Sequence, residues 1–241
     1  MNIVVTGGTG ALGAGVVELF LERGATVHLP MIEPALPKHL AWRNHERVKA
    51  TPKLSLDDEA QVSAFYESLP GLWASIHLVG GFAMAPIAGT SLADFEKQWR
   101  LNTVTCFLTC REAVKAIRRT GAPRHGSDAD GREPVRVGGR IVNVAARPVL
   151  APTGGMLAYV ASKAGVASIT QALAAEVLAE NILVNAVLPS TIDTPANRVA
   201  MPNADHGSWA KPAQIAQTIG FLASSENALT TGALVPVYGR A

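Results

Sequence analysis

The chain has 241 residues, of which 48% are hydrophobic and 17% are charged, and its formal net charge is +2. This length fits one α/β domain, and the apolar excess is typical of a parallel sheet that helices bury on both faces. Interspersed acids and bases leave no basic stripe for nucleic acid, and no apolar run reaches the ~18 residues of a membrane span.

The first residues run directly into a strand and a turn at residues 2–7, without a basic region, an apolar stretch and a cleavage site. We therefore expect a cytoplasmic protein that contacts neither membranes nor nucleic acid.

Apolar runs alternate with longer helical patterns along the chain. Strands are predicted at residues 3–6, 26–29, 47–50, 75–79, 140–144, 183–188 and 234–237. Helices are predicted at residues 11–23, 57–69, 92–118, 157–179 and 212–224. This alternation predicts a single Rossmann-type domain over residues 1–241, with a doubly wound parallel sheet and helices on both faces.

Two segments interrupt the alternation. Residues 120–138 are rich in Gly, Pro, Arg and Asp and are predicted to form a surface insertion at the amino ends of the strands. Residues 194–211 follow the carboxyl end of a strand, where ligands bind in open α/β sheets, and are predicted to form a loop that covers the substrate.

A glycine-rich turn joins the first strand to the first helix. Its glycines permit a tight turn, and the helix that follows offers free backbone N–H groups to a pyrophosphate. The residues expected to bind a dinucleotide here are Gly7, Thr9, Gly10, Ala11, Leu12 and Gly13.

The end of the second strand does not decide between NADH and NADPH. The position that usually carries a ribose-binding acid falls near Pro30 or Met31. Glu33 is able to bind the ribose instead, and a base such as Arg43 would favour a 2′-phosphate.

Tyr159 and Lys163 are four residues apart, so both project from one face of a helix. A lysine ammonium beside a tyrosine stabilises the phenolate and lowers its pKa from about 10, which suits the tyrosine to proton transfer. The cofactor would then move the hydride.

The two cysteines, Cys106 and Cys110, lie four residues apart in a helical stretch without a nearby histidine in the sequence. We expect small core residues in a reducing compartment rather than a metal or redox site.

Taken in order, the glycine turn, Asn102, the strand at residues 139–144, the Tyr159/Lys163 pair and residues 188–194 resemble the short-chain dehydrogenase/reductase family. The resemblance implies that Tyr159 donates the proton, that Lys163 binds the nicotinamide ribose and tunes Tyr159, and that Asn102 holds a relay water. It also places the coenzyme against Gly80, Gly81, Pro189, Ile192 and Thr194.

Two departures from the family pattern are visible. Residues 79–82 read Val-Gly-Gly-Phe where the family usually has Asn-Ala-Gly, and Ala146 occupies the usual position of the catalytic serine. Dihydropteridine reductases, a branch of the family, also carry alanine there. Residues 188–198, Met201-Pro202-Asn203-Ala204-Asp205 and Trp209 are similar to the corresponding run of those enzymes.

This resemblance implies hydride transfer to a quinonoid dihydropterin or a similar conjugated acceptor, whose electron-poor ring needs no polarised ketone. Ala146, Phe82, Met156 and Trp209 are the candidate substrate contacts. Asn102 fits the main branch of the family better than the animal pterin reductases. Reduction of a carbonyl or oxidation of an alcohol therefore stays open, as does a dinucleotide-binding protein without catalysis. The family also implies a homodimer or homotetramer.

Overall fold

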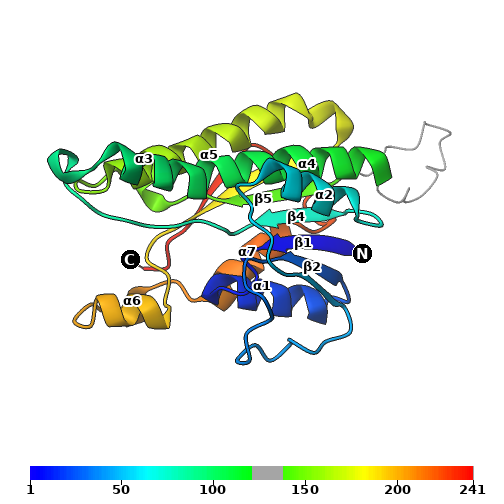
Figure 1. Ribbon diagram of the computed structural model, residues 1–241, viewed down its shortest axis with the longest axis horizontal. Helices are drawn as coiled ribbons and strands as arrows, with labels where there is room; N and C mark the ends of the chain where they lie inside the picture. The colour runs from blue at the N-terminus through cyan, green and yellow to red at the C-terminus, as the bar shows by residue number, and fades with distance from the viewer. Residues whose placement is uncertain (121–137, 241) are drawn as a thin grey trace.

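The structure is a computed structural model that describes residues 1–120 and 138–240. Seven strands form one parallel sheet in the order β3-β2-β1-β4-β5-β6-β7, which confirms the predicted fold class (Figure 1). The strands are β1 (Asn2–Thr6), β2 (Thr26–Pro30), β3 (Val48–Thr51), β4 (Ala74–His77), β5 (Arg140–Val144), β6 (Leu183–Pro189) and β7 (Leu234–Val237). The α-helices are α1 (Ala11–Glu22), α2 (Glu59–Glu67), α3 (Leu92–Trp99), α4 (Thr105–Thr120), α5 (Leu157–Glu176), α6 (Pro195–Ala200) and α7 (Pro212–Leu222).

Helices cover the sheet on both faces. Helices α2, α4 and α5 lie on one face, and α1 and α7 lie on the other (Figure 1). Successive residues of β1 point to opposite faces, so Val4 packs with α2, α4 and α5 while Ile3 and Val5 pack with α1 and α7. The sheet is therefore buried on both sides, as its continuous apolar strands predict.

Successive strands are added on one side of β1 up to β3 and on its other side from β4 onward. The chain moves outward from β1 to β2 and β3, and β4 then pairs with the other edge of β1. Such a switch point opens a crevice at the carboxyl ends of the two central strands, which is where ligands bind in open α/β sheets.

The predicted helix at residues 92–118 is wrong in one respect. A π-helical turn at Arg100–Val104 separates α3 from α4, and α4 continues to Thr120. The side chains in this stretch give no pattern that distinguishes a π turn from an α-helix, so the sequence did not reveal it.

The segment after β6 also differs from the prediction of a loop alone, because it contains α6. The Thr194 hydroxyl accepts a hydrogen bond from the backbone N–H of Asn197, and Pro195 occupies the first helical turn. A threonine cap followed by proline is a helix start signal. The other segment, predicted as a surface insertion, lies outside the described residues over positions 121–137.

No helix in the described part of the chain is long and apolar enough to cross a membrane.

Candidate active site

The glycine turn after β1 brings strand and helix backbones into close contact. Gly7 has a φ of +68°, a conformation that residues with a side chain rarely adopt. A Cβ added to Gly13 would lie 2.0 Å from the carbonyl oxygen of Gly7, so only glycine fits at this position of α1. Ala11 and Leu12 form the first turn of α1 after Gly10, where unpaired backbone N–H groups are available to an anion.

A cleft of about 730 Å³ opens at the switch point. Its lining comes from the turn after β1, the ends of β2 and β4, and α3. The lining residues include Gly7, Thr9, Gly10, Pro30, Met31, Glu33, Leu78, Gly80, Lys97 and Arg100. The volume lies within the usual range of ligand and cofactor pockets. The cleft thus joins the glycine turn to Gly80, as dinucleotide binding requires.

Glu33 lies at the β2 end of this cleft. Its carboxylate accepts a hydrogen bond of 2.8 Å from the Thr9 hydroxyl, so two of the candidate residues hold each other in place. Arg43, the base considered for a 2′-phosphate, is exposed and is absent from the described lining of the cleft.

Tyr159 and Lys163 stand on the first turns of α5, and burial shifts the pKa of each away from its ordinary value. Burial raises the pKa of Tyr159 to about 12. Burial also lowers the pKa of Lys163 to about 8. The Lys163 ammonium donates a hydrogen bond of 2.9 Å to the carbonyl oxygen of Val144, the last residue of β5. At neutral pH the tyrosine is therefore a phenol that holds a proton to donate.

Asn102 lies inside the π turn and is fully buried. Its Oδ1 accepts a hydrogen bond from the Gly81 N–H at 3.0 Å, and its Nδ2 donates to the Gly81 carbonyl at 3.1 Å and to the Ser162 hydroxyl at 3.0 Å. The Ser162 hydroxyl in turn donates to the Tyr159 carbonyl oxygen at 2.8 Å. Asn102 thus ties the segment after β4 to the helix that carries Tyr159 and Lys163.

Gly80 fits tightly between these groups. A Cβ added to Gly80 would lie 2.5 Å from Asn102 Oδ1 and 2.9 Å from Lys163 Nζ. A side chain here would collide with the lysine and the asparagine, so glycine is required at this border of the cleft. The residues present therefore fit a dinucleotide that runs from the glycine turn to Lys163.

The candidate substrate contacts lie in different environments. The Phe82 ring meets the Tyr159 ring edge to face, with 4.9 Å between centroids, and is 60% exposed. Ala146 is buried just beyond β5, and Met156 precedes α5 and is half-buried. Trp209 is buried and contacts the His206 ring at 4.5 Å, so its side chain packs within the segment after α6.

The segment after β6 is fixed by backbone contacts. Pro189 ends β6, Ile192 pairs with Ala210 in an isolated bridge, and Thr194 caps α6. The Asn197 amide donates a hydrogen bond of 2.8 Å to the Ile192 carbonyl oxygen. The candidate coenzyme contacts Ile192 and Thr194 thus belong to an ordered turn.

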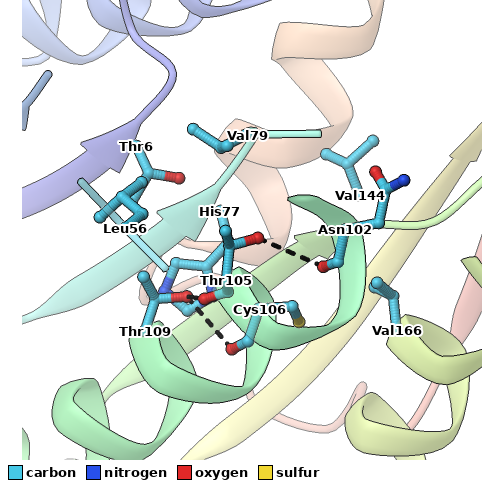
Figure 2. Close-up of a pocket in the computed structure, with 10 residues that line it drawn as sticks. All are labelled: Thr6, Leu56, His77, Val79, Asn102, Thr105, Cys106, Thr109, Val144 and Val166. Atoms are coloured by element: carbon cyan, nitrogen blue, oxygen red, sulfur yellow. Dashed lines mark hydrogen bonds between the residues drawn. The ribbon is translucent and has the colours of Figure 1, made fainter. Parts of the chain in front are cut away.

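Sequence reasoning missed a buried polar cluster behind the cleft. His77, at the end of β4, lies beside Cys106 and Cys110 of α4, although it is about thirty positions away in the sequence. A cavity of about 10 Å³, enough for one water molecule, is lined by His77, Cys106 and Asn102 (Figure 2). Its lining also includes Thr6, Thr105 and Thr109. Only the pairing of β4 with its neighbours and the packing of α4 bring these residues together.

A family model and two characterised relatives assign the chain to the same family. The family described as short chain dehydrogenase matches residues 1–205. The chain is 27% identical to a 3-beta-hydroxysteroid dehydrogenase of Comamonas testosteroni, over 95% of this chain and 91% of that protein. It is 25% identical to a 3-oxoacyl-[acyl-carrier-protein] reductase of Chlamydia muridarum, over 98% of this chain and 95% of the relative.

Solved structures share the fold. ElxO with NADP bound superposes with a TM-score of 0.84 at 21% identity, over 99% of this chain and 97% of that chain. A short-chain type dehydrogenase/reductase from Mycobacterium ulcerans superposes with a TM-score of 0.83 at 20% identity, over 99% and 88% of the two chains.

Proposed function

Because the chain belongs to the short-chain dehydrogenase family, we propose that this NAD(P)H-dependent oxidoreductase reduces a flat, conjugated acceptor, with quinonoid dihydropterin as its representative. Ala146 carries this proposal. A methyl group just beyond β5 is unable to donate a hydrogen bond to a ketone oxygen, so Tyr159 is left as the side-chain proton donor. An electron-poor conjugated ring accepts a hydride without the missing hydroxyl.

Bound in the cleft, the nicotinamide supplies the hydride. The protein supplies the proton and orients the substrate. The Tyr159 hydroxyl keeps its proton at neutral pH, because burial raises its pKa to about 12. The edge-to-face contact with Phe82 limits the movement of the tyrosine ring, and Phe82 presents apolar surface to a flat substrate.

The test compares the wild-type enzyme with Ala146→Ser on quinonoid dihydropterin and on ketones. We expect the wild type to turn over the pterin and to be slow on ketones. The proposal is wrong if ketones are reduced fast by the wild-type enzyme and the pterin is not reduced above the chemical background.

Carbonyl or alcohol chemistry is the second candidate, and two observations favour it. Asn102 is present and hydrogen-bonded to Gly81 and Ser162, and the relatives include a hydroxysteroid dehydrogenase and a 3-oxoacyl reductase. Another group would then polarise the carbonyl. The relatives are named dehydrogenases and reductases, which argues against a dinucleotide-binding protein without catalysis.

For the coenzyme we propose a preference for NADH over NADPH. Glu33 places a carboxylate at the end of the cleft where a ribose 2′ group is expected, and that charge repels a 2′-phosphate. We expect at least a tenfold preference for NADH, equivalent to about 1.4 kcal/mol. Glu33→Gln should reduce this preference, and equal KM values for both coenzymes in the wild type would contradict it.

A further inference from the structure

Three side chains that the proposed reaction does not use bring metal-ligand atoms together behind the cleft. His77 ends β4, and Cys106 and Cys110 lie one turn apart on α4. One ligand atom from each lies within 4.8 Å of the other two, and all three residues are at most 5% exposed. The two sulfur atoms are 3.9 Å apart, and Cys110 Sγ lies 3.5 Å from His77 Nδ1.

We propose that His77, Cys106 and Cys110 form a zinc-binding site, buried directly behind the coenzyme cleft. A tetrahedral zinc ion with Zn–S bonds of about 2.3 Å and Zn–N bonds of about 2.0–2.1 Å places two sulfurs ~3.8 Å apart and sulfur and nitrogen ~3.5 Å apart. The two distances in the cluster match these edges. Two of the three edges therefore need little change. The third, between Cys106 Sγ and the His77 ring nitrogen, lies within 4.8 Å and closes to ~3.5 Å when the ion binds.

A second layer of side chains holds His77 in the orientation that a metal needs. His77 Nε2 lies 2.8 Å from the Ser75 hydroxyl, which lies 2.8 Å from the Tyr66 hydroxyl. The contact of Nδ1 with the Asn143 side-chain oxygen needs a proton on Nδ1, so metal binding shifts the ring proton to Nε2. The Nε2–H then donates to Ser75, and the Nδ1 lone pair is free for the ion.

Metal binding replaces the hydrogen bonds that the ligand atoms now make. The Cys110 thiol donates one of 3.4 Å to Asn143 Oδ1, and the two thiols contact each other at 3.9 Å. His77 Nδ1 lies 2.8 Å from Asn143 Oδ1, and the ion takes over the position of that contact. Asn143 stays anchored, because its Nδ2 donates a hydrogen bond of 2.9 Å to the Thr170 hydroxyl.

The fourth coordination position has space beside the cluster. The cavity of about 10 Å³ in Figure 2 is lined by His77 and Cys106, with polar groups from Asn102, Thr105 and Thr109 around it. It is large enough for one water molecule, which would complete a donor set of one histidine, two cysteines and a water.

The charges and the helix geometry favour an ion over a disulfide. Zinc with two thiolates is neutral, which suits a buried site, and the two thiol protons are released to solvent on binding. Residues four apart on a helix have Cβ atoms ~5–6 Å apart, whereas a disulfide needs ~3.8 Å. A disulfide would therefore unwind α4, whereas an ion bridges the sulfurs without changing the helix.

The test is metal content and coordination in protein produced in medium supplemented with zinc or with cobalt, because a buried site takes up its ion during folding. We expect one equivalent of metal per chain after dialysis. The chain has two cysteines, both in this cluster, so a thiolate-to-cobalt charge-transfer band reports this site alone. Cys110→Ser should lose the band and at least tenfold in metal content, while the exposed His39→Gln control keeps both.

X-ray absorption on the zinc-loaded wild type tests the same site without a variant, in case Cys110→Ser does not fold. Two sulfur scatterers and a histidine nitrogen are expected. A metal content well below stoichiometric, a coordination shell without sulfur, or equal metal loss in His39→Gln would overturn the proposal.

Discussion

At the scale of single residues, burial moves the two reactive groups of α5 in opposite directions. The pKa of Tyr159 is raised to about 12 and that of Lys163 is lowered to about 8. At a pH between these two pKa values, the tyrosine keeps its proton while the lysine is uncharged. In the proposed reaction, the lysine ammonium binds the coenzyme ribose and favours proton release from the tyrosine.

The first prediction is therefore a pH dependence that Lys163 controls. Its charged form is present below its pKa, so kcat/KM for reduction should be high at neutral pH and fall as pH rises through about 8. Lys163→Arg keeps its charge over this range and should remove that inflection, even if its overall rate is lower. Steady-state kinetics of both proteins from pH 6 to pH 10 provide the measurement. An inflection that persists in the arginine variant would assign it to another group.

The second prediction concerns the missing hydroxyl. Ala146→Ser should raise kcat/KM for ketones at least tenfold, because one donor at a developing oxyanion typically contributes 10²–10³ in rate. Ala145→Ser is the matched control, since Ala145 is the adjacent buried alanine and packs into the core. Initial rates with a panel of ketones measure the effect. If Ala146→Ser gains nothing, a different group polarises the substrate.

At the scale of elements, the π turn between α3 and α4 organises the site. It carries Asn102, which joins Gly81 to Ser162 and so fixes α5 relative to the segment after β4. Wide helical turns of this kind occur often at functional sites.

The third prediction tests how closely these elements fit. Gly80→Ala places a Cβ against Asn102 Oδ1 and Lys163 Nζ, and both groups must then shift. We expect coenzyme affinity, measured by fluorescence titration, to fall at least tenfold, and the shift of the buried Asn102 to lower the thermal unfolding temperature as well. Gly89→Ala is the control, because nothing lies within 4 Å of its added Cβ. Equal affinity in both variants would show that Gly80 does not border the coenzyme.

Much of this arrangement was predictable from the sequence, and the reasons are local. The strand β5 and the start of α5 follow from continuous apolar runs and helical periodicity, and their observed bounds agree with the prediction. The π turn has no sequence signature. The His77 cluster forms only because α4 packs against β4. His77 and the two cysteines are far apart in the sequence, so no local pattern could predict it.

At the scale of the whole molecule, the predicted homo-oligomer stays a proposal. Helix α4 presents Phe107, which is 49% exposed with the Arg111 guanidinium 5.6 Å above its ring, and Trp99 is 39% exposed at the end of α3. Large apolar side chains on one helical surface are what an interface between copies of the chain would bury.

The fourth prediction follows from this surface. Phe107→Lys should lower the molecular mass measured by light scattering to that of a smaller assembly, because it places a charge in the proposed interface. Leu229→Lys, at an exposed position outside α4 and α5, should leave the mass unchanged. A monomeric wild type, or an equal effect of both variants, would contradict an interface at α4.

The most direct test of the proposed reaction is coenzyme oxidation followed by absorbance, with quinonoid dihydropterin generated in situ and with NADH and NADPH in separate runs. The account predicts turnover with NADH that Tyr159→Phe lowers by about 10²–10⁴, the usual contribution of a positioned acid. It would be contradicted by a rate no higher than the chemical background in a protein that binds NADH, or by full activity in Tyr159→Phe.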